Sequence, residues 1–286
     1  SLTESNTITA QFTIVLNATP TSDVIIDLNN TDSSEVSLDK NFLTFTPINW
    51  NIPQIITLFS EDDYIIDGTQ TTSITASINI SSDPDYVSLP SQTVSVVTYD
   101  NEIAGAIVTV LDNLTSEDGD IGFFEILLTA QPTDDVTINL GSSNILEGKL
   151  IDTSVTFTPS NWNIPQIITV EGVEDSPPTS DGSIDFKIIT GNVNSSDPNF
   201  DLLDGSSIPD ANMTNQDNDA PGILVTILNN DFTTSESGDI VIVQFSLLSK
   251  PNGGADVTIP LSLSGPSGEM NLNETSITIL NNDWDN

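Results

Sequence analysis

The sequence contains no cysteine, no histidine and no arginine, so lysine is its only basic residue. Without cysteine and histidine, the chain can form no disulfide, thiolate nucleophile, imidazole general base or zinc site of the usual nitrogen and sulfur kind. Its 4 lysines face 42 acidic residues, and the formal net charge is -38. Nucleic acids and anionic membrane surfaces are excluded as partners, because both bind cationic protein surfaces.

Long apolar runs are missing as well. No stretch approaches the roughly 18 apolar residues of a membrane-spanning helix, so we expect no membrane insertion. Amphipathic stretches of helical length are also missing. The chain consists instead of short runs rich in Val, Ile, Thr and Phe, separated by Pro, Gly, Asn, Asp and Ser. This pattern is typical of β-strands joined by turns.

An internal repeat organises the chain. Residues 49–57 recur letter for letter at 161–169, 112 positions later. A third, incomplete copy follows, in which residues 234–236 repeat the Thr-Ser-Glu of residues 115–117. A period of this length predicts tandem whole domains rather than a solenoid of short units.

The copies have unequal ends. The second copy opens with residues 105–111 and the third with 222–228, whereas the first begins without this segment. We therefore expect a domain at 1–103 that lacks its first strand, a complete domain at 104–220, and the N-terminal half of a third at 221–286. A chain that starts and stops inside a repeat is expected to be a piece of a longer protein.

Several short strands in each copy predict a sandwich of two antiparallel sheets. The fold class we expect is all-β, with immunoglobulin-like antiparallel β-sandwich domains arranged end to end. Alternation along the strands predicts the core residues of each copy. These are Phe12, Ile14 and Leu16 in the first copy, Phe124, Ile126 and Leu128 in the second, and Val243, Phe245 and Leu247 in the third.

Acidic residues gather at three matched places in the copies. Sandwich loops meet at the poles, so we expect these clusters to lie together at one pole, beside the domain junction. Clustered carboxylates repel one another unless a cation neutralises them, and several oxygen ligands suit Ca2+. The competing interpretation is that they are only solvated acidic loops. The clusters are Glu4, Glu117 and Glu236; Asp62, Asp63 and Asp67 with Glu174, Asp175 and Asp181; and Asp100 and Glu102 with Asp217 and Asp219.

These motifs resemble the Calx-beta domains. The shared features are Thr-Ser-Glu at 115–117, Thr-Phe-Thr-Pro at 44–47 and 156–159, the acidic segment 62–68, and a closing Asp-Asn-Glu or Asp-Asn-Asp. The resemblance covers essentially the whole chain and implies tandem Calx-beta-like sandwiches of seven strands that bind Ca2+ at one pole. The subtype with Asn-Trp-Asn-x-Pro-Gln is similar to repeats of large bacterial extracellular adhesins and filamentous surface proteins. A secreted or cell-surface location follows from that similarity.

The resemblance also implies which residues bind the metal. The loop before Asp181 is one residue longer than its counterpart in the first copy, so Asp181 can miss the ion. Gln70 stands where the family has a further acid, and the third copy keeps only Glu236. The family's ligand pattern falls on Glu4, Asp62, Asp63, Asp67, Asp100 and Glu102 in the first copy, and on Glu117, Glu174, Asp175, Asp181, Asp217 and Asp219 in the second.

Together these features predict a non-catalytic structural region, such as a stalk or filament shaft. Ca2+ bound at the domain junctions would stiffen the array, and neighbouring repeats of the same chain would be the main partners. The alternative is an adhesion module that binds glycans or another surface, with the repeated Trp50, Trp162 and Trp284 stacking on sugars. The simpler interpretation of each tryptophan is packing on its own sandwich.

Two further interpretations concern catalysis and assembly. A pair of carboxylates can hydrolyse glycosides without histidine, but a catalytic pair occurs once in one pocket, whereas these acids recur in every copy. We therefore expect no enzyme. The sheet edge exposed by the missing first strand can instead accept a strand from an identical subunit and so build a filament.

Overall fold

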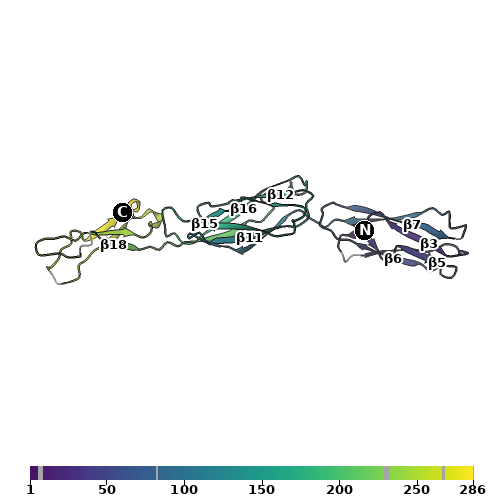
Figure 1. Cartoon of the computed structure of the whole chain (residues 1–286), viewed down its shortest axis with the longest axis horizontal. Coiled ribbons are helices and arrows are strands. Elements are labelled where there is room, and N and C mark those ends of the chain that lie inside the picture. The colour runs from purple at the N-terminus through teal and green to yellow at the C-terminus, as the bar shows by residue number, and fades with distance from the viewer. Residues whose placement is uncertain (6–8, 82, 229–231, 266–267, 286) are drawn as a thin grey trace.

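The molecule is an elongated chain of β-sheets (Figure 1). Its strands form three groups that follow one another along the long axis. We name them the first unit (β1–β8), the second unit (β9–β17) and the third unit (β18–β21). Within the described part of the chain, no helix is long and apolar enough to cross a bilayer. This computed structural model describes residues 1–5, 9–81, 83–228, 232–265 and 268–285.

The second unit is a sandwich of two sheets. One sheet has the strand order β10-β17-β16-β12-β14, and the other has the order β13-β15-β11-β9. All paired neighbours run antiparallel except β10 and β17, which run parallel. The strands are β9 (Ala106–Asp112), β10 (Leu114–Ser116), β11 (Ile121–Leu128), β12 (Val136–Ser142), β13 (Gly148–Leu150), β14 (Ser154–Phe157), β15 (Gln166–Gly172), β16 (Ile184–Ser195) and β17 (Ala211–Gln216).

The first unit repeats this arrangement strand for strand, except that none of its described strands corresponds to β9. Its sheets have the orders β1-β8-β7-β3-β5 and β2-β6-β4, and β1 runs parallel to β8 as β10 does to β17. The strands are β1 (Leu2–Thr3), β2 (Thr9–Ile14), β3 (Val24–Asn30), β4 (Val36–Leu38), β5 (Phe42–Phe45), β6 (Gln54–Ser60), β7 (Gln70–Ser81) and β8 (Gln92–Tyr99).

The described residues of the third unit form two antiparallel strand pairs and two short turns of 3-10 helix. The pairs join β18 to β19 and β20 to β21. The elements are β18 (Ile223–Ile227), β19 (Val243–Leu247), η2 (Asn252–Gly254), β20 (Val257–Pro260), β21 (Ser276–Ile279) and η3 (Asn281–Asp283).

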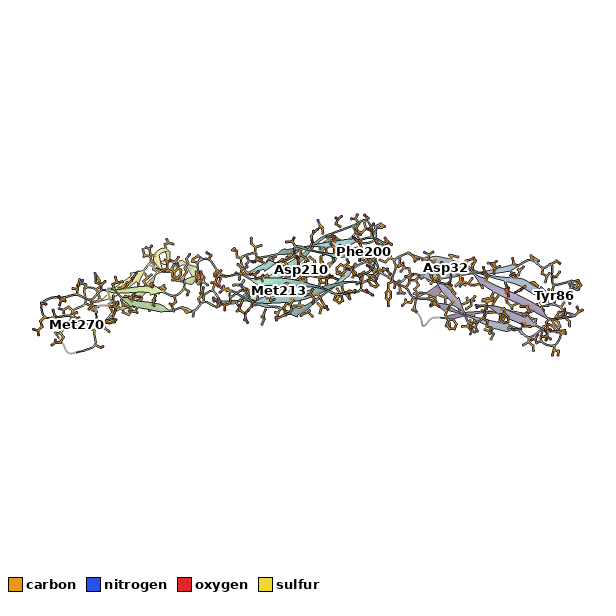
Figure 2. The ribbon with its side chains drawn as sticks, in the orientation of Figure 1. Asp32, Tyr86, Phe200, Asp210, Met213 and Met270 are labelled. Carbon is orange, nitrogen blue, oxygen red and sulfur yellow. The ribbon has the colours of Figure 1, made fainter. Side chains whose placement is uncertain are left out.

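Alternating apolar side chains from the facing sheets fill the second unit. Phe124 and Ile126 are 0% exposed, and Leu128 is 2% exposed. Phe200 and Met213 complete this core (Figure 2). The three residues predicted for this core from strand alternation are therefore all buried.

The matched positions in the other two units are less completely covered. Phe12 and Ile14 are only half-buried. In the third unit Leu247 is buried, but Val243 is 39% exposed. Burial follows the number of strands among the described residues, where the second unit has nine strands, the first has eight with no counterpart of β9, and the third has four.

A loop of each of the first two units contacts the unit that follows it. In the loop between β6 and β7, the Tyr64 carbonyl oxygen accepts a hydrogen bond from the Gln131 amide, at 2.6 Å. The neighbouring Ile66 packs against the core of the second unit. At the next junction, the Lys250 amide donates to the Pro178 carbonyl oxygen at 2.8 Å. The same backbone contact therefore recurs at both junctions.

The tryptophans of the repeated segment pack on the protein. Trp162 is 9% exposed and belongs to the core of the second unit, and Trp50 packs against the core of the first. The ring of Trp162 also contacts Tyr64 across the junction, with 5.3 Å between ring centroids. Trp162 is thus covered mainly by protein contacts.

Truncating one matched phenylalanine in each of the first two units tests the difference in packing. We expect Phe124→Ala to destabilise the second unit by about 3–5 kcal/mol, because it empties a fully buried site. Phe12→Ala should cost less, because Phe12 is already half-exposed. Differential scanning calorimetry of both variants measures the two losses, and equal losses would contradict this account of the cores.

Candidate metal centre

The acidic clusters of the first unit meet at the end that faces the second unit. One carboxylate oxygen from each of Glu4, Glu35 and Asp67 lies within 4.8 Å of the others. A second group, with the same spacing limit, joins Glu4 to Asp100 and Glu102. Glu4 belongs to both groups and so connects two adjoining sites.

The second unit builds a matching pair of groups. Glu117 joins Asp217 and Asp219 in one group, and Asp175 and Asp181 in the other. Glu117 occupies the position of Glu4, directly after a strand that pairs in parallel with the last strand of the unit. The recurrence of this geometry follows from the repeated topology, because each acid stands at the end of an equivalent strand or in an equivalent loop.

Turns fix the closing acids of each unit. The Asp100 carboxylate accepts hydrogen bonds from the amides of Gly68 and Glu102, at 2.7 and 2.8 Å. Gly68 has a φ of +77°, a backbone conformation that side chains with a Cβ rarely adopt. In the second unit, the Gly182 amide donates to Asp217 in the same way, at 2.6 Å. The glycine after the acidic loop therefore positions one carboxylate in each unit.

These groups contain carboxylate oxygens that are buried without a hydrogen-bond partner. Within the described residues, every buried carboxylate oxygen of this kind belongs to one of the two units' acidic groups. A buried acceptor left unpaired costs about 1–3 kcal/mol, and more when it is charged. The unpaired oxygens belong to Glu4, Glu35, Glu102, Asp181 and Asp219.

No basic side chain compensates this charge. The two ion pairs of the described chain join Lys40 to Asp39 and Lys149 to Glu171, and neither involves a clustered acid. At an effective dielectric constant of about 20, two full charges 4.8 Å apart repel by about 3 kcal/mol. The clusters therefore store repulsion that a bound cation would relieve.

The pKa values of the clustered acids reflect this environment. Burial, together with the neighbouring carboxylates, raises the pKa of Glu4 to about 8. Burial and repulsion from Asp175 and Asp217 raise the pKa of Glu117 to about 7. Burial is also the main cause of the raised pKa values of Glu35, Asp67, Glu102, Glu147, Asp175 and Asp219.

Two acids elsewhere show what a structural carboxylate looks like in this fold. The Asp83 carboxylate accepts hydrogen bonds from the amide and hydroxyl of Thr21, and these bonds lower its pKa. Asp197 accepts the same pair of bonds from Thr133, and although burial opposes the shift, its pKa is also lowered. The pKa shifts of Glu4, Glu117 and the other acids raised by burial run in the opposite direction.

The close groups contain some of the predicted ligands and leave others out. Asp62, Asp63 and Glu174 lie outside the close groups; Asp63 instead accepts a hydrogen bond from the Ile65 amide at 2.7 Å. Asp181 joins Glu117 and Asp175 in a close group despite the longer loop. Glu236 is exposed and belongs to none of the groups found among the described residues.

Two buried glutamates near the acidic groups were not predicted from the sequence. Glu35, directly before β4, joins the first group, and Glu147, at the matched position before β13, is 8% exposed beside the second. Glu147 accepts a hydrogen bond from the side-chain amide of Asn215 at 3.3 Å. Each is a single acid with no acidic neighbour in sequence, so only its recurrence at the repeat spacing of 112 could have revealed it.

The donor set fits a hard divalent cation. Two oxygens bound to one Ca2+ at about 2.4 Å each lie up to about 4.8 Å apart, which is the spacing limit within each group. Each group of three carboxylates can offer up to six oxygens, which suits the flexible oxygen coordination of Ca2+. Glu4, Glu35, Asp67, Asp100 and Glu102 are the residues that could hold it in the first unit.

In the absence of divalent cations, stability should fall as the pH rises. The native-state pKa of Glu4, about 8, exceeds its ordinary value of 4.5. The folded protein therefore binds more protons than the unfolded chain between those values, and its free energy of unfolding decreases across that window. Thermal melts of the cation-free chain from about pH 5 to pH 9 measure the decline. Glu4→Gln should weaken it for the first unit.

Asp197→Asn is the matched control, because its carboxylate is stabilised rather than strained. With a lowered pKa, Asp197 contributes stability above its ordinary pKa and loses it only in acid. The asparagine variant should therefore be less stable at neutral pH, by about 1 kcal/mol. A loss of stability in both Glu4→Gln and Asp197→Asn at about pH 9 would count against stored repulsion at Glu4.

No protein-family model and no curated protein matches the chain. The solved structures it resembles include the calcium binding domain CBD12 of CALX1.1, at 13% identity and a TM-score of 0.32, covering 75% of this chain and 96% of that one. They also include domains 4 and 5 of the S-layer protein SbsC, at 10% identity and a TM-score of 0.28, covering 67% and 69%. A third is the CsuC-CsuE chaperone–tip adhesion subunit complex of Acinetobacter baumannii, at 11% identity and a TM-score of 0.27, covering 75% and 93%. Values this low assign neither a family nor a function.

Proposed function

We propose that this chain is a non-catalytic structural region of a secreted or surface-attached protein, stiffened by Ca2+ bound beside its unit junctions. The observation that supports this proposal most directly is that one loop both contributes to an acidic group and contacts the next unit. Asp67 of the loop between β6 and β7 belongs to an acidic group, while Tyr64 and Ile66 of the same loop contact the second unit. Any ion that fixes Asp67 therefore also fixes the docking residues.

The second junction has the same construction. The loop between β15 and β16 contributes Asp175 and Asp181 to an acidic group. Between these two acids, Pro178 accepts the Lys250 amide, and Thr179 forms a parallel bridge with Lys250. Because the arrangement recurs, one mechanism would stiffen every junction of a longer array.

Ca2+ would act by removing repulsion. Without a cation, the clustered carboxylates push the acidic loop away from the neighbouring strand ends, and the docking residues lose a defined position. With Ca2+, the loop is tied to Glu4 after β1, or to Glu117 after β10, and offers its carbonyl oxygens to the next unit. The recurrence of the groups in two units supports a structural role, since a catalytic pair would occur once.

An extracellular setting suits these sites. Extracellular calcium modules typically bind with a dissociation constant of about 0.1–1 mM, which millimolar Ca2+ outside cells saturates. At about 5 mM Ca2+, such a site adds about 1–2 kcal/mol to the free energy of unfolding. The acidic surface would keep a long array soluble and apart from its neighbours.

Thermal melts with and without Ca2+ test the proposal. We expect about 5 mM Ca2+ to raise the melting temperature by several degrees over chelator, and equal Mg2+ to raise it much less. Glu117→Gln should reduce the shift of the second unit, because Glu117 belongs to both of its groups. Asp23→Asn, which removes an equal charge from an exposed acid outside the groups, should leave the shift unchanged.

Identical melting temperatures in Ca2+ and in chelator would contradict the calcium proposal and would mean that the acids only lie in solvated loops. If Asp23→Asn lowered the Ca2+-induced shift in melting temperature as much as Glu117→Gln does, the shift would be explained by general charge screening instead of a specific site.

Junction stiffness needs a separate measurement. We expect small-angle X-ray scattering to show a longer, narrower distribution of dimensions in Ca2+ than in chelator. Tyr64→Ala removes the ring contact with Trp162 but no carboxylate. It should therefore shorten the molecule in Ca2+ while leaving calorimetric Ca2+ binding intact. Loss of both binding and extension would mean that Tyr64 supports the ion site itself.

A further inference from the structure

Three polar side chains meet inside the second unit, where β10 pairs with β17. They are the hydroxyl of Thr115, the amide of Asn215 and the carboxyl group of Glu147, and none of them belongs to a close acidic group. Thr115 lies on β10, Asn215 on β17, and Glu147 directly before β13. Thr115 and Asn215 are each 1% exposed, and Glu147 is 8% exposed. Water therefore has little access to the three groups.

The amide of Asn215 lies between the other two groups. The Thr115 hydroxyl donates a hydrogen bond to Oδ1 of Asn215 at 2.9 Å, and it also lies 3.4 Å from the Thr214 carbonyl oxygen. On the other side, Nδ2 of Asn215 donates to Oε2 of Glu147 at 3.3 Å. Nδ2 also donates to the Val173 carbonyl oxygen at 3.0 Å. A nucleophilic oxygen thus lies beside the amide carbonyl, and a carboxyl group lies beside the amide nitrogen.

The hydroxyl oxygen is close to the carbon that it could attack. Thr115 and Asn215 are direct partners in the parallel ladder of β10 and β17. Because a C=O bond is about 1.23 Å long, Cγ of Asn215 lies within about 4.1 Å of the Thr115 oxygen. Reacting atoms in a near-attack geometry are about 3–3.5 Å apart. A shift of about 1 Å or less therefore brings the two atoms to that geometry.

A glycine makes room for the amide. A Cβ at Gly172 of β15 would lie 2.6 Å from Oδ1 of Asn215. In the first unit, Ser60 stands at the position of this glycine. There, Leu2 pairs with Thr98 where the second unit pairs its threonine with its asparagine. The amide and the space for it therefore occur together in the second unit, and the first unit has neither.

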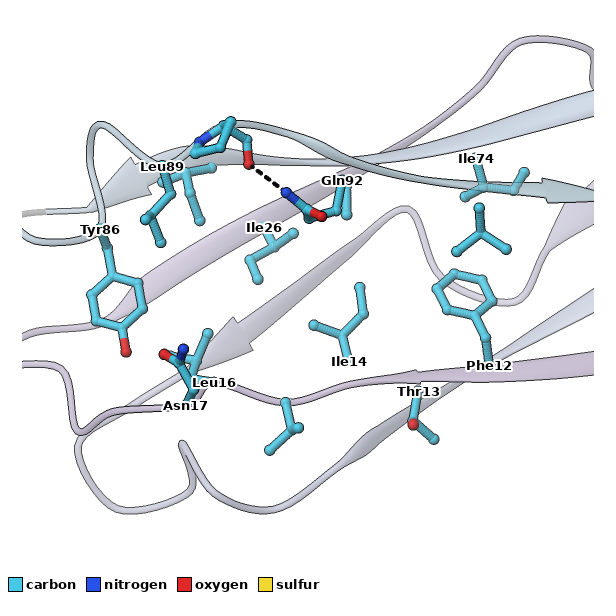
Figure 3. Close-up of a pocket in the computed structure, with 15 residues that line it drawn as sticks. Phe12, Thr13, Ile14, Leu16, Asn17, Ile26, Ile74, Tyr86, Leu89 and Gln92 are labelled. Atoms are coloured by element: carbon cyan, nitrogen blue, oxygen red, sulfur yellow. Dashed lines mark hydrogen bonds between the residues drawn. The ribbon is translucent and has the colours of Figure 1, made fainter.

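An amide of the first unit has different surroundings. Gln92 lines an apolar pocket there, is exposed, and donates a hydrogen bond to the Pro90 carbonyl oxygen at 3.3 Å (Figure 3). Its partner is a backbone oxygen, which is no nucleophile toward an amide. Asn215 instead is buried between a hydroxyl and a carboxyl group. The surroundings of Asn215 are those of a reacting group.

We propose that Thr115 and Asn215 form a covalent ester link between β10 and β17. The Thr115 oxygen forms a bond to Cγ of Asn215, and the bond between Cγ and Nδ2 breaks. The hydroxyl proton leaves with the nitrogen as ammonia, so the step balances without an oxidant or a cofactor. Glu147 relays this proton, because it is hydrogen-bonded to the leaving nitrogen. Burial then protects the ester from hydrolysis.

The link would stabilise the second unit in the way that a disulfide does. Thr115 and Asn215 are 100 residues apart in the chain, so a bond between them restricts the unfolded state strongly. The chain has no cysteine and cannot form a disulfide for this purpose. The step occurs once in each molecule and turns over no substrate, which agrees with a non-catalytic structural region. It uses no acid of the close groups and is independent of the calcium proposal.

Mass spectrometry of the full 286-residue chain tests the proposal. We expect the mass to be lower than that of the sequence by one ammonia molecule. Cleavage after lysine in denaturant should leave segment 41–149, which carries Thr115, attached to the segment that begins at 188 and carries Asn215. No disulfide can mimic this link, because the chain has no cysteine. Mild alkali should separate the two segments, because it hydrolyses esters faster than amides.

Four variants identify the reacting groups. Thr115→Val removes the hydroxyl and should abolish both the ammonia loss and the joined segments, whereas Thr115→Ser keeps the hydroxyl and should retain both. Thr190→Val is the matched control, because Thr190 is a buried threonine of the same unit whose hydroxyl donates to the Ile208 carbonyl oxygen at 2.8 Å. It should retain the link. Glu147→Gln should slow formation of the link by about 100-fold or more, followed as mass against time after cell-free synthesis.

Several outcomes would overturn the proposal. One is an unchanged mass together with separate segments after cleavage. A second is an ammonia loss that persists in Thr115→Val, which would assign it to an asparagine that reacts with its own backbone. A third is a Thr115→Ser chain without the link. Formation at an unchanged rate in Glu147→Gln would overturn the role given to Glu147.

Discussion

Carboxylates that are buried together without a basic partner are the constraint on which this structure depends. The chain has 4 lysines against 42 acids, so it has few cations with which to neutralise the acids that converge at one end of the first unit and of the second. Glycine turns and the ends of parallel strands hold the acids in place. Several carboxylate oxygens remain without a hydrogen-bond partner. The loops that contact the next unit contribute acids to these two clusters, and the raised pKa values belong to acids in or beside them.

Much of the fold could be predicted because the chain repeats itself. Alternating apolar residues indicated the strands, and the repeat spacing showed that each strand belongs to a unit. The all-β sandwich architecture was therefore accessible from the sequence alone. The difference in burial between Phe12 and Phe124 was not, because it depends on whether a strand covers them rather than on their own chemistry.

The site was predicted less completely, for reasons that the geometry makes clear. Runs of acids indicated Asp62, Asp63 and Glu174 as ligands, but a run does not show which of its side chains turn toward the other acids. Asp62 and Glu174 are exposed, and Asp63 accepts a hydrogen bond from the Ile65 amide instead. Glu35 and Glu147 reach the acidic end of each unit from a separate loop. Convergence of that kind depends on which strands pair, and local sequence carries little information about pairing.

The parallel pairing of β10 with β17 has a mechanical consequence. The chain enters the second unit at the end that faces the first unit and leaves at the end that faces the third (Figure 1). Tension along the molecule therefore pulls β10 and β17 past each other in opposite directions. Their evenly spaced hydrogen bonds then bear the load together instead of opening one after another. In an array of such units, the parallel pair that corresponds to β10 and β17 would resist stretching in each unit.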